Sequence, residues 1–130
     1  MYFLDTCAMI EFVKDNPRYV KLIKNNLFYT SDFQLMELYF ITLREQGVET
    51  AEKYFEVFSL AKVSILEKTL KNAMKKRLEL YHKKIDGKSF NVSYVDAIGY
   101  QYALENNLKF VTCDPAFQKL SNVEFIPEKE

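Results

Sequence analysis

The chain has 130 residues and a mass of 15.4 kDa, which suits one compact domain, so residues 1–130 are expected to form a single domain. Hydrophobic residues make up 48% of the chain and charged residues 28%, with three glycines and three prolines, which excludes a disordered or collagen-like protein. The 18 basic residues balance the 18 acidic ones, so bulk positive charge is not expected to hold nucleic acid, and the single histidine excludes zinc sites built on several histidines.

Short apolar runs alternate with amphipathic stretches, which is typical of a layered α/β fold with a mostly parallel sheet. The first part of the chain is expected to form a strand at 2–4, a helix at about 8–13, a helix at about 17–24 and a brief extended segment at 27–29. Ser31 begins a capping box, which predicts a helix over about 32–46 that stops at Gly47.

The same alternation continues to the end of the chain. It predicts a helix at about 49–59, a strand at 62–66, a helix at about 67–84, a helix at about 93–106, a strand at 110–112, a short helix from 115 and a last strand at 123–126. Asp86-Gly87 is expected to break the long helix, and Ser93 to cap the next one. Four or five strands and about six helices follow from this pattern.

Cysteine usage and the amino-terminal segment bear on the compartment. Two cysteines in a chain without a signal peptide indicate reduced thiols rather than a disulfide framework, so a cytoplasmic protein is expected. Cys7 and Cys113 are expected to be small buried hydrophobic side chains. The opening segment is short, contains Asp5 and Glu11 and lacks a basic leader, so no contact with a membrane is expected.

Three aspartates lie where the predicted elements would bring them together. Asp5 follows the first predicted strand and Asp114 follows the strand at 110–112, while Asp96 lies in the first turn of a helix. Ligands of open α/β sheets bind outside the carboxyl ends of the strands, so these side chains are expected to reach one crevice. The alternative for each is that it belongs to a helix start: Asp5 (or Thr6 in its place) and Asp114 as N-caps, and Asp96 as the acid of a capping box.

Glu37 has no capping explanation. At about 100° per residue it is expected to project among Phe33, Phe40 and Ile41, in the apolar sector of its helix. A buried carboxylate needs a partner, because burying it uncompensated costs several kcal/mol or more. Arg44 is one candidate partner, and a divalent cation shared with the three aspartates is the other.

Carboxylates without histidine or thiolate ligands suit a hard cation such as Mg²⁺ or Mn²⁺. Such ions keep several waters and take the rest of their ligands from substrate phosphate. The chemistry that follows is phosphodiester hydrolysis, in which a metal-activated water attacks in line and a metal stabilises the leaving oxygen.

Four segments in register resemble the motifs of PIN-domain ribonucleases. The opening FLDTCAMIEF resembles their hydrophobic-LDT/S start, and Ser31 to Leu38 is similar to their Ser-x5-Glu-Leu segment. Val95-Asp96-Ala97-Ile98 resembles the Asp-Ala-x-Ile helix, and Phe110 to Phe117 resembles the closing hydrophobic-x-Thr-x-Asp-x-x-Phe motif. The middle region, 49–89, aligns with no motif of the family.

This resemblance implies a three-layer α/β/α sandwich with a mainly parallel four- to five-stranded sheet. It implies that Asp5, Glu37, Asp96 and Asp114 bind one or two Mg²⁺ or Mn²⁺ ions, with Thr112 as a supporting hydroxyl. The implied activity is endonucleolytic cleavage of single-stranded RNA. A chain of this size most resembles the toxin of a VapBC-type toxin–antitoxin pair, which implies a homodimer and an antitoxin whose carboxyl-terminal segment covers the acidic pocket.

Positive charge is concentrated in one part of the chain. Residues 62–88 hold nine basic and three acidic residues, a net charge of +6, so the rest of the chain carries −6. Lys75, Lys76 and Arg77 are the candidates to hold RNA phosphates beside the acidic site. The alternative is an ordinary solvated helix face.

Two other functions compete with the ribonuclease. One is a PIN-like or receiver-like module that binds a partner without cleaving anything. The other is a phosphatase of the haloacid-dehalogenase kind, which places a second aspartate two residues after the first, where this chain has Cys7. The presence of all four acids favours a catalytic protein.

Overall fold

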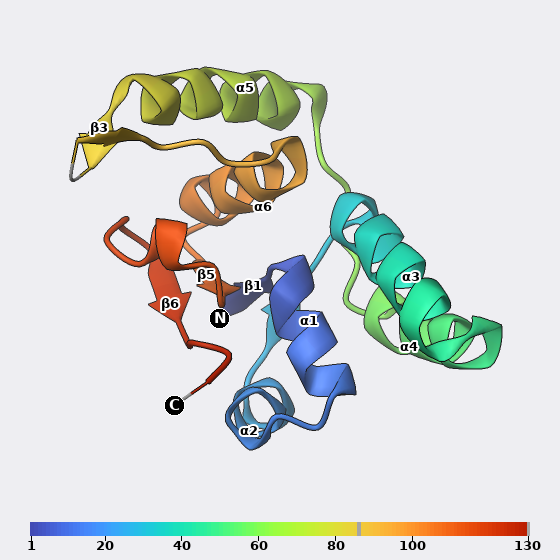
Figure 1. Ribbon diagram of the computed structural model, residues 1–130. Coiled ribbons are helices and arrows are strands. Elements are labelled where there is room, and N and C mark those ends of the chain that lie inside the picture. Colours follow the sequence, from blue (N-terminus) through green and yellow to red (C-terminus); the bar gives the residue numbers. More distant parts are fainter. Residues whose placement is uncertain (86, 130) are drawn as a thin grey trace.

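A four-stranded parallel sheet lies at the centre of the molecule, with helices on both of its faces (Figure 1). The computed structural model describes residues 1–85 and 87–129. In chain order the elements are β1 (Tyr2–Leu4), α1 (Thr6–Val13), α2 (Pro17–Asn25), β2 (Phe28–Tyr29), α3 (Asp32–Gln46), α4 (Val48–Ser59), α5 (Glu67–His82), β3 (Lys84–Ile85), β4 (Lys88–Ser89), α6 (Tyr94–Glu105), β5 (Lys109–Thr112), the 3₁₀ helix η1 (Pro115–Phe117) and β6 (Val123–Phe125).

The strand order β2-β1-β5-β6 makes the first and fifth strands neighbours. Leu4 of β1 is paired with Val111 of β5, and the Asp5 N–H continues this pairing by donating to the Val111 carbonyl at 3.0 Å. Because all pairs of this sheet are parallel, the carboxyl ends of β1 and β5 meet at the same edge. The residues that follow these two strands therefore lie close together.

The two faces of the sheet bury different side chains. Phe3 and Phe110 point to the face covered by α5 and α6, whereas Leu4 and Val111 point to the face covered by α1 to α4. Buried partners on the first face are Leu80, Phe90, Val92, Ala97, Tyr100, Ala103, Leu108 and Phe117. Buried partners on the second are Ala8, Met9, Val13, Tyr19, Ile23, Leu35, Leu38 and Phe58. The structure is therefore the predicted three-layer α/β/α sandwich with a mainly parallel sheet.

Capping signals placed the helix boundaries well. The Ser31 hydroxyl accepts the Phe33 N–H at 3.2 Å at the start of α3, and the helix ends at Gly47, whose φ of 95° favours glycine. Helix α6 begins after Ser93, as predicted. Within the described parts of the chain, no helix is long and apolar enough to cross a membrane.

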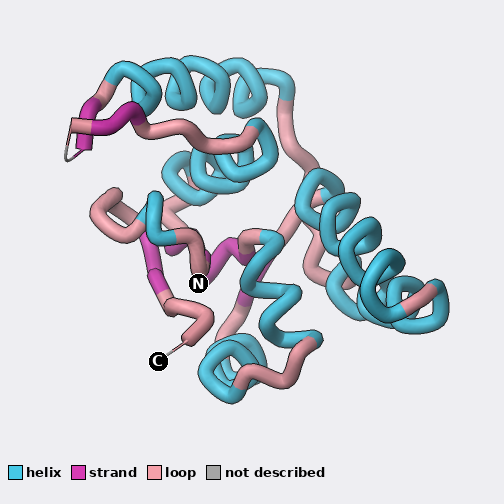
Figure 2. The backbone as a smooth tube through the Cα atoms, in the orientation of Figure 1, coloured by secondary structure: helices cyan, strands magenta, loops and turns pink. Residues whose placement is uncertain are grey.

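One prediction for the middle of the chain was wrong, and one predicted helix is present but ends about two residues early. Residues 62–66 do not form a strand: a single bridge joins Thr30 to Lys62, and the chain then runs as a loop to α5 (Figure 2). The reason is that β2, the strand it would extend along, is itself two residues long. Helix α5 ends at His82, before the predicted boundary, because the chain enters the antiparallel pair β3–β4. Asp86, the first residue of the Asp86-Gly87 pair predicted to break this helix, lies outside the described residues.

Candidate active site

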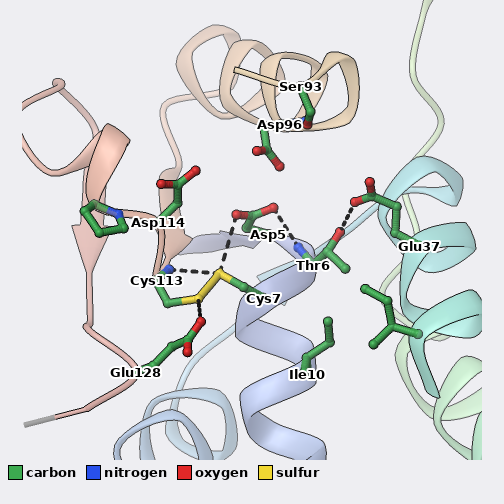
Figure 3. A pocket seen from close by; sticks show the side chains of 12 residues that line it. Asp5, Thr6, Cys7, Ile10, Glu37, Ser93, Asp96, Cys113, Asp114 and Glu128 are labelled. Carbon is green, nitrogen blue, oxygen red and sulfur yellow. Dashed lines mark hydrogen bonds between the residues drawn. A yellow bond between two sulfur atoms is a disulfide. The ribbon is translucent and has the colours of Figure 1, made fainter. Parts of the chain in front are cut away.

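The carboxyl edge of the sheet opens into a pocket of about 400 Å³ (Figure 3). Its walls come from segments far apart in sequence: the start of α1, the middle of α3, the start of α6, the segment after β5 and the carboxyl-terminal tail. The lining residues are Asp5, Thr6, Cys7, Ile10, Glu37, Ile41, Ser93, Asp96, Cys113, Asp114, Pro115 and Glu128. All four carboxylates predicted from the sequence are among them.

Asp5 is held at the floor of this pocket by two hydrogen bonds. One carboxylate oxygen, Oδ1, accepts the Thr6 N–H at 2.7 Å, and the other, Oδ2, accepts the Thr112 hydroxyl at 2.7 Å. Thr112 is fully buried and its Oγ1 also accepts the Asp114 N–H at 3.1 Å. Thr112 therefore links the two acidic residues that follow β1 and β5, and it acts on them as a positioning residue.

Asp96 enters the pocket from above Asp5 in Figure 3. Ser93 caps α6 by accepting the Asp96 N–H at 3.1 Å, which fixes the first turn of the helix. The Asp96 carboxyl group faces that of Asp5 in the pocket (Figure 3). Two neighbouring carboxyl groups favour a bound proton or cation, because two negative charges repel.

Burial and mutual repulsion perturb both groups. Burial raises the pKa of Asp5 well above its ordinary value, and the negative charge of Asp96 raises it further. Burial is also the main reason why the pKa of Asp96 is raised, with contributions from the charges of Glu37 and Asp114. A cation in the pocket would oppose each of these effects, because it favours the ionised carboxylates.

Asp114 both caps a helix and lines the pocket. Its Oδ1 accepts the Ala116 N–H at 3.0 Å at the start of η1, and Asp5 caps α1 in a comparable way. An aspartate can therefore cap a helix and line the pocket at the same time. This is possible because a helix begins soon after each of these strands, which leaves the capping aspartate at the edge of the sheet.

Glu37 lines the pocket, but its predicted burial in an apolar sector was wrong. The side chain is half-buried, and Phe40 is 59% exposed. Arg44 is not its partner: the guanidinium lies 5.4 Å from the Phe40 ring centroid and 3.9 Å from Glu45. Instead, the Thr6 hydroxyl donates to Glu37 Oε1 at 2.7 Å. Helix α3 buries Leu35, Leu38, Thr42 and Gln34, and this choice of buried face leaves Phe40 in solvent.

The cysteines differ from their predicted state. The structure joins Cys7 and Cys113 by a disulfide in the pocket wall, with Cα atoms 6.1 Å apart, so the expectation of two reduced thiols was wrong. Each follows one of two neighbouring parallel strands, which brings the sulfur atoms together. The sequence signal for this pairing was that Cys7 lies two residues after Asp5 and Cys113 one residue before Asp114, at the ends of the two predicted strands.

Glu128 is a fifth carboxylate of the pocket that sequence reasoning missed. Its carbonyl accepts from Asn16 Nδ2 at 3.3 Å and from an Arg18 guanidinium nitrogen at 3.0 Å, and its side chain lies 3.5 Å from the sulfur of Cys113. Tyr19 also donates its hydroxyl to the carbonyl of Ile126. No motif marks this tail, and its position depends on contacts with α2.

The predicted RNA-binding residues lie on α5, outside the acidic pocket. Lys75 is exposed, and Lys76 Nζ lies 3.5 Å from Glu79. Arg77 is engaged with the segment before α6: its Nε donates to the Val92 carbonyl at 2.9 Å. Helix α5 covers the outer side of α6 in Figure 1.

The donor set fits a hard divalent cation by its chemistry, since its oxygen atoms come from carboxylates. Asp5, Asp96, Asp114 and Glu37 could hold such an ion. Across residues 1–85 and 87–129, however, no three acidic, histidine or cysteine side chains form a ready-made metal cluster. The four carboxylates thus line one pocket without forming such a cluster.

A central parallel sheet between two helical layers, with carboxylates where two central strands end, defines the class of this protein. The sequence matches the family model of the PIN domain over residues 2–123. The chain therefore belongs to the PIN domain family. A search of curated proteins found no match.

Solved structures with the same fold are similar over most of their length. A toxin–antitoxin complex from Klebsiella pneumoniae has a chain with a TM-score of 0.74 and 14% identity, covering 95% of this chain and 96% of that one. VapBC2 from Rickettsia felis, bound to a DNA fragment from its promoter, has a TM-score of 0.73 and 20% identity, covering 97% of each chain. VapC20 from Mycobacterium tuberculosis, a Sarcin–Ricin loop cleaving toxin, has a TM-score of 0.69 and 14% identity, covering 84% of this chain and 85% of that one.

Proposed function

We propose that this PIN-domain protein is a metal-dependent endoribonuclease that cleaves single-stranded RNA, and that it is the toxin of a VapBC-type pair. The observation that carries the proposal is that Asp5, Glu37, Asp96 and Asp114, from four separate segments, line one pocket. The similar solved structures, which include a toxin–antitoxin complex and an RNA-cleaving toxin, support the same function.

In this proposal the four carboxylates hold one or two Mg²⁺ or Mn²⁺ ions. Such an ion, when bound, supplies an activated water for attack on a phosphodiester and neutralises the leaving oxygen. Thr112 keeps the Asp5 carboxylate oriented, and Ser93 fixes the helix start that carries Asp96. The Thr6 hydroxyl holds Glu37, which lies across the pocket from Asp114 (Figure 3). The hydroxyl groups of Thr112, Ser93 and Thr6 therefore position the acids that would touch the metal.

The test is cleavage of end-labelled single-stranded RNA in Mn²⁺ or Mg²⁺ buffer. Wild type should cleave, and Asp5→Asn should lose at least about 100-fold of the rate because it removes a carboxylate from the centre of the pocket. Asp32→Asn is the matched control, since Asp32 is exposed and paired with Lys62 at 3.2 Å outside the pocket. Equal cleavage by wild type and Asp5→Asn, or none by wild type, would contradict the proposal.

The proposed partner is a cognate antitoxin, acting in the cytoplasm. A groove lined by Met36, Phe40 and Arg44 adjoins the acidic pocket, with which it shares Glu37 and Ile41. The exposed apolar side chains of this groove suit a protein segment, and the carboxylates beyond it suit a basic side chain.

The partner proposal is tested with the protein encoded by a short reading frame next to this gene. That protein should inhibit RNA cleavage, and Phe40→Asp should weaken the inhibition. Leu60→Asp, at an 89% exposed residue outside the groove, serves as the control. Light scattering on the isolated chain tests the proposed homodimer.

A further inference from the structure

Helix α6 begins with an aromatic side chain that faces solvent. Tyr94 is 63% exposed, although its chain neighbour Ser93 and the nearby Asp96 both line the acidic pocket. A large exposed ring contributes little to the core, so folding does not explain it. Its place at the edge of the pocket makes it a candidate for contact with substrate.

Arg77 of α5 holds this ring from one side. The guanidinium carbon lies 4.5 Å from the Tyr94 ring centroid, a cation–π contact. Arg77 is itself fixed, because Nε donates to the Val92 carbonyl at 2.9 Å and a terminal nitrogen donates to Asn91 Oδ1 at 3.4 Å. The ring is therefore oriented before any ligand arrives, which reduces the entropy lost on binding.

We infer that Tyr94, held by Arg77, is a stacking platform for a nucleobase of single-stranded RNA. The inference rests on the proposed ribonuclease function and names a subsite for its substrate. Exposed aromatic side chains bind bases of any sequence by stacking, and arginine adds a positive charge for the neighbouring phosphates. This subsite would offset the repulsion between the acidic pocket and the RNA backbone.

The helix geometry indicates where the stacked base would lie. Tyr94 and Asp96 are two residues apart, which is about 200° around an α-helix, so Tyr94 does not face the metal-binding acids. The stacked base would therefore lie outside the acidic pocket. The RNA strand would leave the pocket past Ser93, cross the start of α6 and reach Arg77 and the lysines of α5.

The experiment measures RNA binding without cleavage, by fluorescence anisotropy of a labelled 12-nucleotide RNA in Mn²⁺ buffer on the Asp5→Asn protein. Tyr94→Ala should weaken binding by about 5- to 100-fold, and Tyr94→Phe should retain the affinity because it keeps the ring. Leu60→Ala removes another large exposed side chain, 89% accessible at the end of α4, and should leave the affinity unchanged.

A scan of abasic sites along the RNA provides a second measurement. Because the change is made in the RNA, its effect on the protein with Tyr94 does not depend on whether a protein variant folds. One or two abasic positions should weaken binding to the protein with Tyr94 and have no effect on Tyr94→Ala. Unchanged affinity in Tyr94→Ala, equal losses in Tyr94→Phe and Tyr94→Ala, or an abasic effect that persists in Tyr94→Ala would overturn the inference. If wild type neither binds nor cleaves RNA, the proposed function fails as well, and that result is distinct from the other three.

Discussion

Asp5 and Asp96 link the stability of the fold to the charge of the pocket. Asp5 is 3% exposed and Asp96 is half-buried; the charge of Asp96 disfavours ionised Asp5, and the charges of Glu37 and Asp114 disfavour ionised Asp96. The hydroxyl and N–H groups around Asp5 favour its ionised form, but burial outweighs them. Ionisation of these two carboxyl groups is therefore disfavoured unless a cation is bound.

The raised pKa values predict a pH dependence of stability. The folded protein binds protons at Asp5 and Asp96 more tightly than the unfolded chain, in which such groups titrate near 3.8. Their contribution to stability is therefore present at low pH and is lost as pH rises through the raised pKa values. In EDTA, Asp96→Asn should raise the melting temperature at pH 7 by a few degrees and have a smaller effect at pH 4.

Differential scanning calorimetry with and without Mn²⁺ checks this prediction. Added Mn²⁺ should stabilise wild type at pH 7 and stabilise Asp96→Asn less. Asp32→Asn, outside the pocket, should behave as wild type. A lower melting temperature for Asp96→Asn than for wild type in EDTA at pH 7 would show that the two carboxyl groups do not repel.

The hydrogen bond from Thr6 to Glu37 makes a second prediction at the residue scale. Thr6→Val keeps the side-chain volume and removes the donor, so Glu37 would lose its fixed position. We expect Thr6→Val to bind Mn²⁺ with an affinity lower by about 10-fold or more, as is typical when a residue that orients a metal ligand is lost. Thr6→Ser retains the donor and should bind Mn²⁺ as wild type does. Titration calorimetry distinguishes the two variants, and equal affinities would refute the role of the Thr6 hydroxyl.

At the scale of elements, the close approach of α6 to the sheet positions Asp96. A methyl group at Gly99 would lie 2.7 Å from Gln34 Nε2 and 2.9 Å from the rings of Phe3 and Phe110. Gln34 cannot easily move, since its amide donates to the Val95 carbonyl at 3.0 Å and its Oε1 accepts from Ser31. Helices α3 and α6, which carry Glu37 and Asp96, are thus joined through Gln34.

The Gly99→Ala substitution therefore has two opposing effects on the free energy of unfolding: a gain in helix propensity and a cost from overpacking. Alanine favours a helix over glycine by about 1 kcal/mol. Overpacking a close-packed site costs about 1–3 kcal/mol, and here the neighbours are buried rings. We expect a net destabilisation of about 1–2 kcal/mol in urea unfolding, whereas Gln46→Ala at the exposed end of α3 should change stability little. A more stable Gly99→Ala protein would mean that α6 can move away from the sheet.

At the scale of the whole molecule, charge is separated between two regions. Residues 62–88, which include α5, carry a net charge of +6, and the rest of the chain carries −6. The acidic pocket lies at the edge of the sheet, whereas α5 covers the outer side of α6 (Figure 1). An RNA strand held by α5 would thus be presented to the carboxylates from the side of α6.

Charge reversal of both Lys75 and Lys76 tests this arrangement. It should weaken RNA binding and flatten the dependence of affinity on salt, because fewer counterions are released. The matched control reverses Lys21 and Lys24, two exposed lysines of α2. Anisotropy titrations at several salt concentrations compare the variants. Unchanged binding by the α5 variant at both low and high salt would leave α5 as a solvated helix face.

Much of the fold and the three aspartates of the pocket could be read from the sequence, because they depend on local patterns, whereas the local argument for Glu37, burial in an apolar sector, was wrong. Apolar periodicity located α3 and α6, and the capping residues Ser31, Ser93 and Asp114 marked the starts of α3, α6 and η1. The predicted strand at 62–66 did not form, because a strand also needs a partner in the sheet. Its apolar pattern is typical of a strand, but the strand beside it, β2, has two residues, and a single bridge joins Thr30 to Lys62.

By itself the sequence determined most of the helices, their caps and the acids at the ends of β1 and β5, since each is set by residues within about one helical turn. The tertiary structure alone decided which distant groups meet. Thr6 reaches Glu37 across 31 positions and Cys7 reaches Cys113 across 106, and Glu128 arrives through the docking of the tail on α2. These contacts depend on strand order and on the face that each helix buries, and no local pattern encodes either.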